Sequence, residues 1–193
     1  MRRKAPPGRL ANLDPIETKP ARPVCGRSWT NRTLVRRGRA PTSTVASDKA
    51  FAAQALALKR AERAGLPLPR LGRAYFGLVC DDPRSSEAEL FQRAATALGG
   101  RVAHLRPAVA HLDQDGDVPS TAQWLGRIYD AVECQGLPPE RVAQIRSAAG
   151  IPVFDCLSCQ RNTVAMQGLL DDGTDELDAR RYVVQAVLLS LFS

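Results

Sequence analysis

The chain has 193 residues, with 27 Lys and Arg against 20 Asp and Glu, and a formal net charge of +7. This length is enough for one domain with a proper hydrophobic core and a tail. Because no apolar run approaches the roughly 18 residues that a membrane helix needs, no membrane-spanning helix and no membrane contact are predicted.

The basic charge belongs to residues 1–47, which carry eleven Lys and Arg against two Asp and Glu, while residues 48–193 carry sixteen against eighteen. Residues 1–47 are rich in Pro, Arg, Ser and Thr and lack a hydrophobic period, so we expect a disordered leader. A solvated tail is the plain interpretation. The more specific interpretation is that its Lys and Arg side chains contact the phosphates of a nucleic acid or an acidic membrane. Because Trp29 alone supplies an aromatic ring, nucleic-acid binding is disfavoured. A misplaced start codon is a further alternative.

Five cysteines are present, and Cys80 and Cys134 fall inside apolar strands. This position predicts buried free thiols in a reducing compartment. The N-terminus is basic but lacks the apolar core of a secretory signal. We therefore expect a cytoplasmic protein.

Helices and strands alternate along the chain. A helix is expected over 48–64, with Phe51, Ala55 and Leu58 on one face. The predicted strands are 72–80, 101–106, 130–134 and 151–154. Because Pro152 lacks an amide proton, we expect the fourth strand either to begin at Pro152 or to lie at a sheet edge. Helices are predicted between successive strands, the second with Leu125, Ile128 and Tyr129 inward, and further helices over 162–170 and from Asp175 or Asp178.

This order predicts an α/β fold, a three-layer arrangement in which a parallel sheet of about four strands has helices on both faces. Ser86 followed by Glu89 predicts a capping box for the helix after the first strand. Ligands of such sheets bind at the carboxyl ends of strands, near helix N-termini. The expected places for chemistry are therefore just after Cys80, Leu105, Val132 and Phe154.

Three blocks of the chain follow a known order of motifs. Residues 125–136 (LGRIYDAVECQG) are similar to L-G-R-M-Y-D-x-I-x-x-R-G, residues 148–158 to a-G-V-P-V-x-N-x-L-T, and residues 91–102 to F-e-x-A-A-x-x-x-G-G-x-V. These motifs are those of the aspartate and ornithine carbamoyltransferases, and the chain most closely resembles the ornithine enzymes. The resemblance covers about 48–170 and implies a carbamoyl-phosphate-binding domain over 48–172. Residues 173–193 resemble the family's closing helix, without the intervening amino-acid domain.

The resemblance also places the family's ligand motifs on this chain, where most of them are altered. The phosphate motif S-T-R-T-R falls on residues 84–88, which read Arg-Ser-Ser-Glu-Ala, so both motif arginines are replaced. The arginine of the R-G pair is Gln135, and H-P-T-Q falls on 161–164, where only the threonine remains. The H-K-E-S loop falls near 114–117, with no cation. The degenerate substrate positions are thus Arg84, Ser85, Ser86, Gln135, Arg161 and Thr163, and we assign no catalytic residue.

Charge agrees with this loss, because residues 81–89 hold four carboxylates against Arg84 alone. Carboxylates near a helix start stabilise the helix and repel a phosphate. We therefore expect a carbamoyltransferase-like chain without transferase activity. One alternative is residual binding of carbamoyl phosphate or another small anion, with Arg127 as a possible extra cation. Another is a regulatory subunit in a homo- or hetero-trimer with a carbamoyltransferase, through Val187, Leu188 and Leu191.

Three further patterns are weaker. The D-x-D-G-D run over 113–117 lacks the distal Glu of a calcium loop, so an acidic turn is favoured. Cys156 and Cys159 form a C-x-x-C whose redox or metal use is conceivable, but packing without a shared function is favoured. His104 is expected to be a structural histidine within its strand. No cofactor and no metal are predicted.

Overall fold

The computed structural model describes residues 44–108, 112, 117–159 and 164–192. Four parallel strands form one sheet in the order β2-β1-β3-β4. They are β1 (Tyr75–Val79), β2 (Arg101–Leu105), β3 (Ala131–Cys134) and β4 (Val153–Asp155). The predicted α/β fold with a parallel four-stranded sheet is confirmed, and β4, which begins directly after Pro152, lies at an edge of the sheet as predicted.

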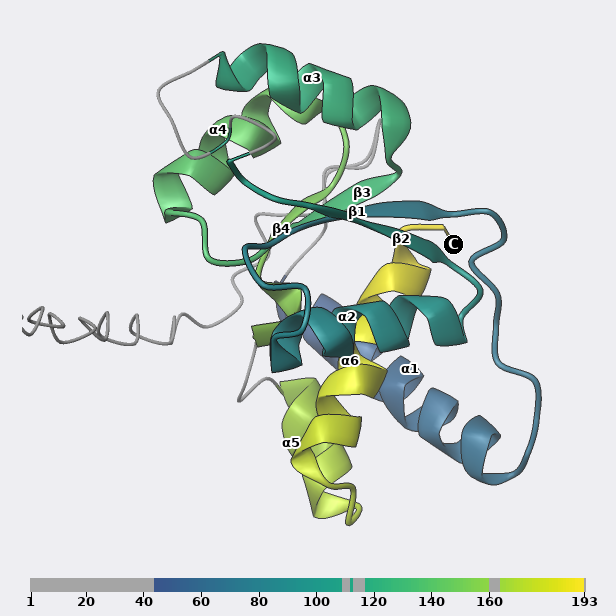
Figure 1. Cartoon of the computed structure of the whole chain (residues 1–193). Helices are drawn as coiled ribbons and strands as arrows, with labels where there is room; N and C mark the ends of the chain where they lie inside the picture. The colour runs from purple at the N-terminus through teal and green to yellow at the C-terminus, as the bar shows by residue number, and fades with distance from the viewer. Residues whose placement is uncertain (1–43, 109–111, 113–116, 160–163, 193) are drawn as a thin grey trace, which may run out of the picture.

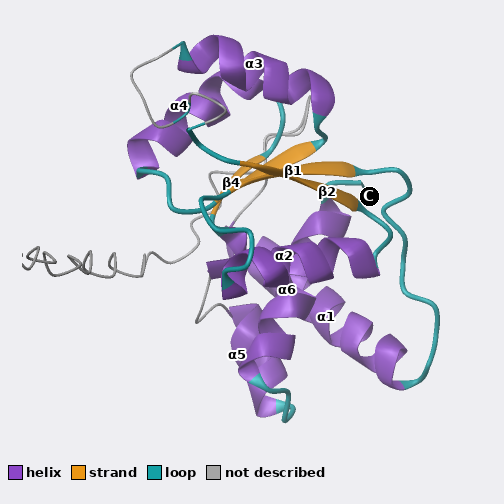
Figure 2. Cartoon of the chain, viewed as in Figure 1, coloured by secondary structure: helices purple, strands orange, loops and turns teal. Residues whose placement is uncertain are grey.

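Helices cover both faces of the sheet (Figure 1). α3 (Val118–Ile128) and α4 (Pro139–Ala149) pack on one face. α2 (Ser86–Ala97) packs on the other, together with α1 (Thr44–Arg63), α5 (Val164–Asp171) and α6 (Glu176–Ser190). The colouring by secondary structure separates these layers clearly (Figure 2). α1 begins at Thr44, four residues earlier than the sequence predicts.

Side-chain alternation along β1 divides the core into two clusters. Phe76 and Leu78 face α2 and α6, whereas Val79 faces α3 and α4, as expected for a strand buried on both sides. Gly77 leaves room for the ring of Tyr129, which would lie 3.1 Å from a Cβ at that position. Ile128 is exposed, so its predicted inward position is wrong. The neighbouring Tyr129 is buried against β1 instead.

α6 is the most completely buried helix of its layer, and it packs against α1, α2 and α5. Val187 and Leu188 are buried within the chain itself, so the expectation that they form a free surface for a partner is wrong. Two polar contacts within this layer join α1 to α6 and to the end of α5. Lys59, which is buried, donates to the carboxylate and the carbonyl of Asp172, and Arg181 pairs with Glu62 at 2.8 Å. Among the described residues, no helix is long and apolar enough to cross a bilayer.

The α3–α4 contact yields the first testable prediction. A Cβ at Gly126 would lie 1.9 Å from the carbonyl oxygen of Ala149, so Gly126→Ala must push the two helices apart. We expect a loss of about 1–3 kcal/mol in the free energy of unfolding, as for other overpacked sites. Urea denaturation measures this loss.

Gly168 in α5 is the matched control, because a Cβ there meets nothing within 4 Å. Gly168→Ala should stabilise by up to about 1 kcal/mol through helix propensity alone. Equal effects of the two substitutions would contradict a close α3–α4 packing.

Candidate functional site

The candidate site lies where α2 begins, beside the carboxyl ends of β1 and β3. Ser85 is the N-cap of α2, with extended backbone angles, and its hydroxyl accepts from the amide of Ala88 at 3.2 Å. The predicted Ser86–Glu89 capping box is therefore wrong, because the cap is Ser85 and the residue three positions later is Ala88, which cannot complete a capping box. Ser86 is instead the first residue of the helix, and its hydroxyl donates to the carboxylate of Glu87 at 2.8 Å.

Glu87 brings a carboxylate of the chain itself to this helix N-terminus. Burial alone would raise its pKa, but the Ser86 hydroxyl, its own backbone amide and Arg180 together lower that pKa below its usual value. Arg180 comes from α6, is buried, and lies 3.6 Å from the Glu87 carboxylate. A negative group that accepts a first-turn amide is stabilised by the helix dipole. The charge that favours an anion here is thus satisfied internally.

Glu133 is the central acceptor of the site, and it is fully buried in β3. Its carboxylate accepts from the amides of Leu157 and Ser158, at 3.0 and 3.1 Å, and from the Ser158 hydroxyl at 2.8 Å. Gln135 donates to the same carboxylate at 3.3 Å. Burial raises the pKa of Glu133, and these donors offset only part of that effect.

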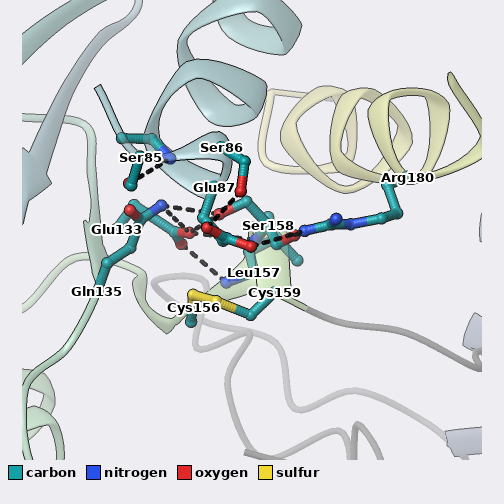
Figure 3. Close-up of a disulfide and its surroundings, with 11 residues drawn as sticks. Ser85, Ser86, Glu87, Glu133, Gln135, Cys156, Leu157, Ser158, Cys159 and Arg180 are labelled. Carbon is teal, nitrogen blue, oxygen red and sulfur yellow. Dashed lines mark hydrogen bonds and ion pairs between the residues drawn. A yellow bond between two sulfur atoms is a disulfide. The ribbon is translucent and has the colours of Figure 1, made fainter. Parts of the chain in front are cut away.

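Ser158 joins this buried group to α6, as Figure 3 shows. Its carbonyl accepts from Nε and Nη2 of Arg180, and its hydroxyl also accepts from Gln135 at 2.7 Å. Arg180 therefore connects η1 (Leu157–Cys159) with the start of α2. Gln135 stands where the resemblance places a lost arginine. Its Nε2 donates to Glu133 and Ser158, so both of its hydrogens are used within the chain.

Cys156 and Cys159 form a disulfide around η1. The sequence favours packing without a shared function for these cysteines, whereas in the structure the tight turn joins the two side chains. Cys156 has φ 48, a left-handed conformation that is unfavourable for a residue with a Cβ. Cys80 and Cys134 are buried free thiols, as the sequence predicts.

The other predicted positions are scattered. Arg84 is exposed, and its amide donates to Asp82 at 2.8 Å. Arg127 is exposed on α3, across the sheet from α2. Arg161 and Thr163 lie outside the described residues. Ala88, at the second motif arginine, is fully buried in the core, so this position now serves packing.

Two further predictions concern residues away from this site. His104 lies in the edge strand β2, in the strand where the sequence places it, and it is exposed; its structural role stays a prediction. Asp117 caps α3 by accepting from the Ser120 amide at 3.1 Å, and residues 113–116 of the acidic run lie outside the described residues. Where the structure is described, no group of three or more His, Cys, Asp or Glu could hold a metal ion.

Sequence reasoning missed Glu87, Glu133 and Arg180. A usable signal existed for Glu133, because a carboxylate inside an otherwise apolar strand must find donors or become neutral. Three of its four donors come from residues 24 and 25 positions later in the chain. Arg180 gave no such signal, since its partner across the fold depends on where α6 packs.

The parallel strands, crossover helices and α2 N-terminus define an α/β domain of the class that binds ligands at the carboxyl ends of its strands. No protein-family model matches the chain. The catabolic ornithine carbamoyltransferase of Burkholderia mallei is 33% identical over 109 residues, which cover 56% of this chain and 32% of that protein. The ornithine carbamoyltransferase of Actinobacillus pleuropneumoniae serotype 5b is 32% identical over 101 residues, 52% of this chain and 30% of that protein.

Solved structures give the same likeness of fold. The ornithine carbamoyltransferase of Pyrococcus furiosus superposes with a TM-score of 0.53 and 22% identity, covering 57% of this chain and 35% of that one. The enzyme of Burkholderia thailandensis gives 0.53 and 14% identity over 58% and 39%. The resemblance to carbamoyltransferases is confirmed. The chain spans about a third of the length of the curated relatives it matches.

The buried carboxylate predicts a distinctive pH dependence. The pKa of Glu133 is higher in the folded chain than in the unfolded one, so its contribution to stability is complete below the unfolded value of about 4.3. The contribution is lost as the pH rises toward the folded pKa. Urea unfolding from pH 4 to 8 should therefore show wild type losing stability relative to Glu133→Gln.

Taking the difference in free energy of unfolding between wild type and Glu133→Gln cancels the effect of the other carboxylates. Several of these have lowered pKa values, which change stability with pH in the opposite direction. Glu62 is an example, because its hydrogen bond with Arg181 lowers its pKa. A difference that grows in favour of wild type as the pH rises would show that the four donors outweigh burial.

Proposed function

We propose that this chain is a carbamoyltransferase-like domain whose phosphate site is occupied by its own side chains, and that it does not transfer carbamoyl groups. The observation that carries this proposal is the Glu87–Arg180 pair at the N-terminus of α2. A phosphate dianion needs free amides and cations at a helix start. Here a carboxylate occupies that place, and its nearest cation is already paired.

Electrostatics around the pair supports the same proposal. Asp81, Asp82 and Glu89 are exposed beside Glu87, with Arg84 as the one cation within residues 81–89. Local repulsion lowers the concentration of anions at such a surface. Ser85 also engages the Ala88 amide, so one more first-turn donor is unavailable to a ligand.

Chemistry points to inactivity as well. Electrostatic stabilisation of a developing charge is worth several kcal/mol for each well-placed donor. The resemblance places such donors at positions now held by Ser86, Ala88 and Gln135. Ala88 is packed in the core and Gln135 donates to Glu133 and Ser158, so neither is available for that role.

Calorimetry with carbamoyl phosphate tests the proposal. We expect no saturable heat at millimolar ligand, and no citrulline or carbamoyl aspartate on addition of ornithine or aspartate. An intact carbamoyltransferase in the same buffer is the positive control. Saturable binding would support the alternative of a residual anion-binding protein, and turnover would contradict the proposal outright.

A charge-restoring variant provides a sharper test. Ser86→Arg with Glu87→Thr returns a cation and removes the internal carboxylate, so we expect measurable phosphate binding where wild type has none. Ser86→Arg with Glu89→Thr is the matched control, because it makes the same change in net charge but keeps Glu87. Equal affinities for phosphate would mean that general charge, and not the Glu87–Arg180 pair, excludes the anion.

A regulatory role beside an intact carbamoyltransferase remains the second candidate, favoured by the shared fold alone. Copurification with such an enzyme, read as a mass larger than either partner by light scattering, tests it. The basic residues 1–43 lie outside the described residues, and nucleic-acid binding through them stays a disfavoured, untested alternative.

A further inference from the structure

The loop that the disulfide closes holds the centre of the candidate site. Cys156 and Cys159 flank two residues, Leu157 and Ser158, and both of these donate their amides to the buried Glu133. The same turn presents the Ser158 carbonyl to Arg180. One covalent bond therefore encloses the contacts that join β3 to α6.

The backbone of this loop includes an unfavourable conformation at one residue. Cys156 takes the left-handed conformation, which residues with a Cβ rarely adopt. Its amide bonds to the Cys134 carbonyl at 2.8 Å, and its carbonyl accepts from Cys159 at 3.0 Å. Such a conformation persists where the surroundings impose it. The disulfide is the covalent part of those surroundings.

We propose that Cys156–Cys159 is a thiol–disulfide exchange site, whose reaction partner is a dithiol. The position fits this chemistry because Cys159 is half-buried, whereas Cys156 is 9% exposed, so Cys159 is the more exposed of the two residues. A bridge across four residues also restricts the unfolded chain little, so little folding free energy protects it.

The exchange takes place in two steps. A thiolate of the dithiol attacks Sγ of Cys159, a new S–S bond forms, and the Cys156–Cys159 bond breaks with its electron pair passing to Sγ of Cys156, which then takes a proton. The second thiol of the partner, as its thiolate, attacks the partner's own sulfur in the mixed disulfide. Cys159 leaves and is protonated. The cysteine pair gains two electrons and two protons, and the dithiol becomes a disulfide.

The remaining described cysteines do not compete in this exchange. Cys80 and Cys134 are buried in strands or directly after them, and burial raises the pKa of both thiols. A thiol without thiolate character is a poor nucleophile. Among the cysteines of the described residues, reduction then acts on the 156–159 pair alone. Its release frees Leu157 and Ser158 from Glu133 and loosens the link to Arg180.

The experiment uses the full chain with Cys25→Ser, since Cys25 lies outside the described residues. The folded protein is treated with millimolar dithiothreitol, alkylated, and mapped by peptide mass. We expect Cys156 and Cys159 to become alkylated while Cys80 and Cys134 do not, and oxidised glutathione to restore the bond. Amide hydrogen exchange at Leu157 and Ser158 should rise at least tenfold on reduction.

Cys156→Ser with Cys159→Ser is the matched control, whose amides at Leu157 and Ser158 should exchange rapidly with or without dithiothreitol. If that variant does not fold, reduction of the parent protein still decides the matter. Alkylation that requires denaturant overturns the proposal, as does failure of oxidised glutathione to form the bond. Reduction that leaves the two amide exchange rates unchanged also overturns it.

Discussion

The carboxylate of Glu133 is the group on which the carboxyl end of the sheet depends. It is fully buried, and every donor that compensates it comes from residues 135–158. A buried carboxylate without donors would cost several kcal/mol or take up a proton. The chain after β4 must therefore turn back over β3, and this turn fixes Ser158 where Arg180 can reach it.

Arg180 then couples the closing helix to the start of α2. It is buried, bonds to the Ser158 carbonyl, and faces Glu87. Buried cations need partners of this kind, because an unpaired guanidinium in the interior is strongly destabilising. The same arrangement supports the proposal that the helix N-terminus offers little to an external anion. Its positive end, one hydroxyl and one guanidinium are all directed to a carboxylate of the chain itself.

Much of the fold was predictable because short apolar strands and glycine-ended helices alternate. The errors concern which of two neighbouring residues takes a position. Ser85 rather than Ser86 is the N-cap of α2, because the turn that follows Asp82 leaves Ser85 extended. Tyr129 rather than Ile128 points inward, because its ring fills the space above Gly77. Both are choices of one residue that local patterns cannot resolve.

The site was less predictable, because its partners lie far apart in sequence. Altered motif positions indicated what is lost, but the compensating contacts join residues 87, 133, 158 and 180. The disulfide also escaped prediction, since C-x-x-C alone does not specify whether the turn between the cysteines closes. Tertiary packing decides both cases.

The most direct test of this account is the side-chain carboxyl signal of Glu87, followed by carbon NMR through a pH titration with and without carbamoyl phosphate. The account predicts a pKa below the usual glutamate value, unchanged by the ligand, and a shift upward in Arg180→Met. A Glu87 signal that titrates normally, or that moves saturably with carbamoyl phosphate, would contradict an internally occupied anion site.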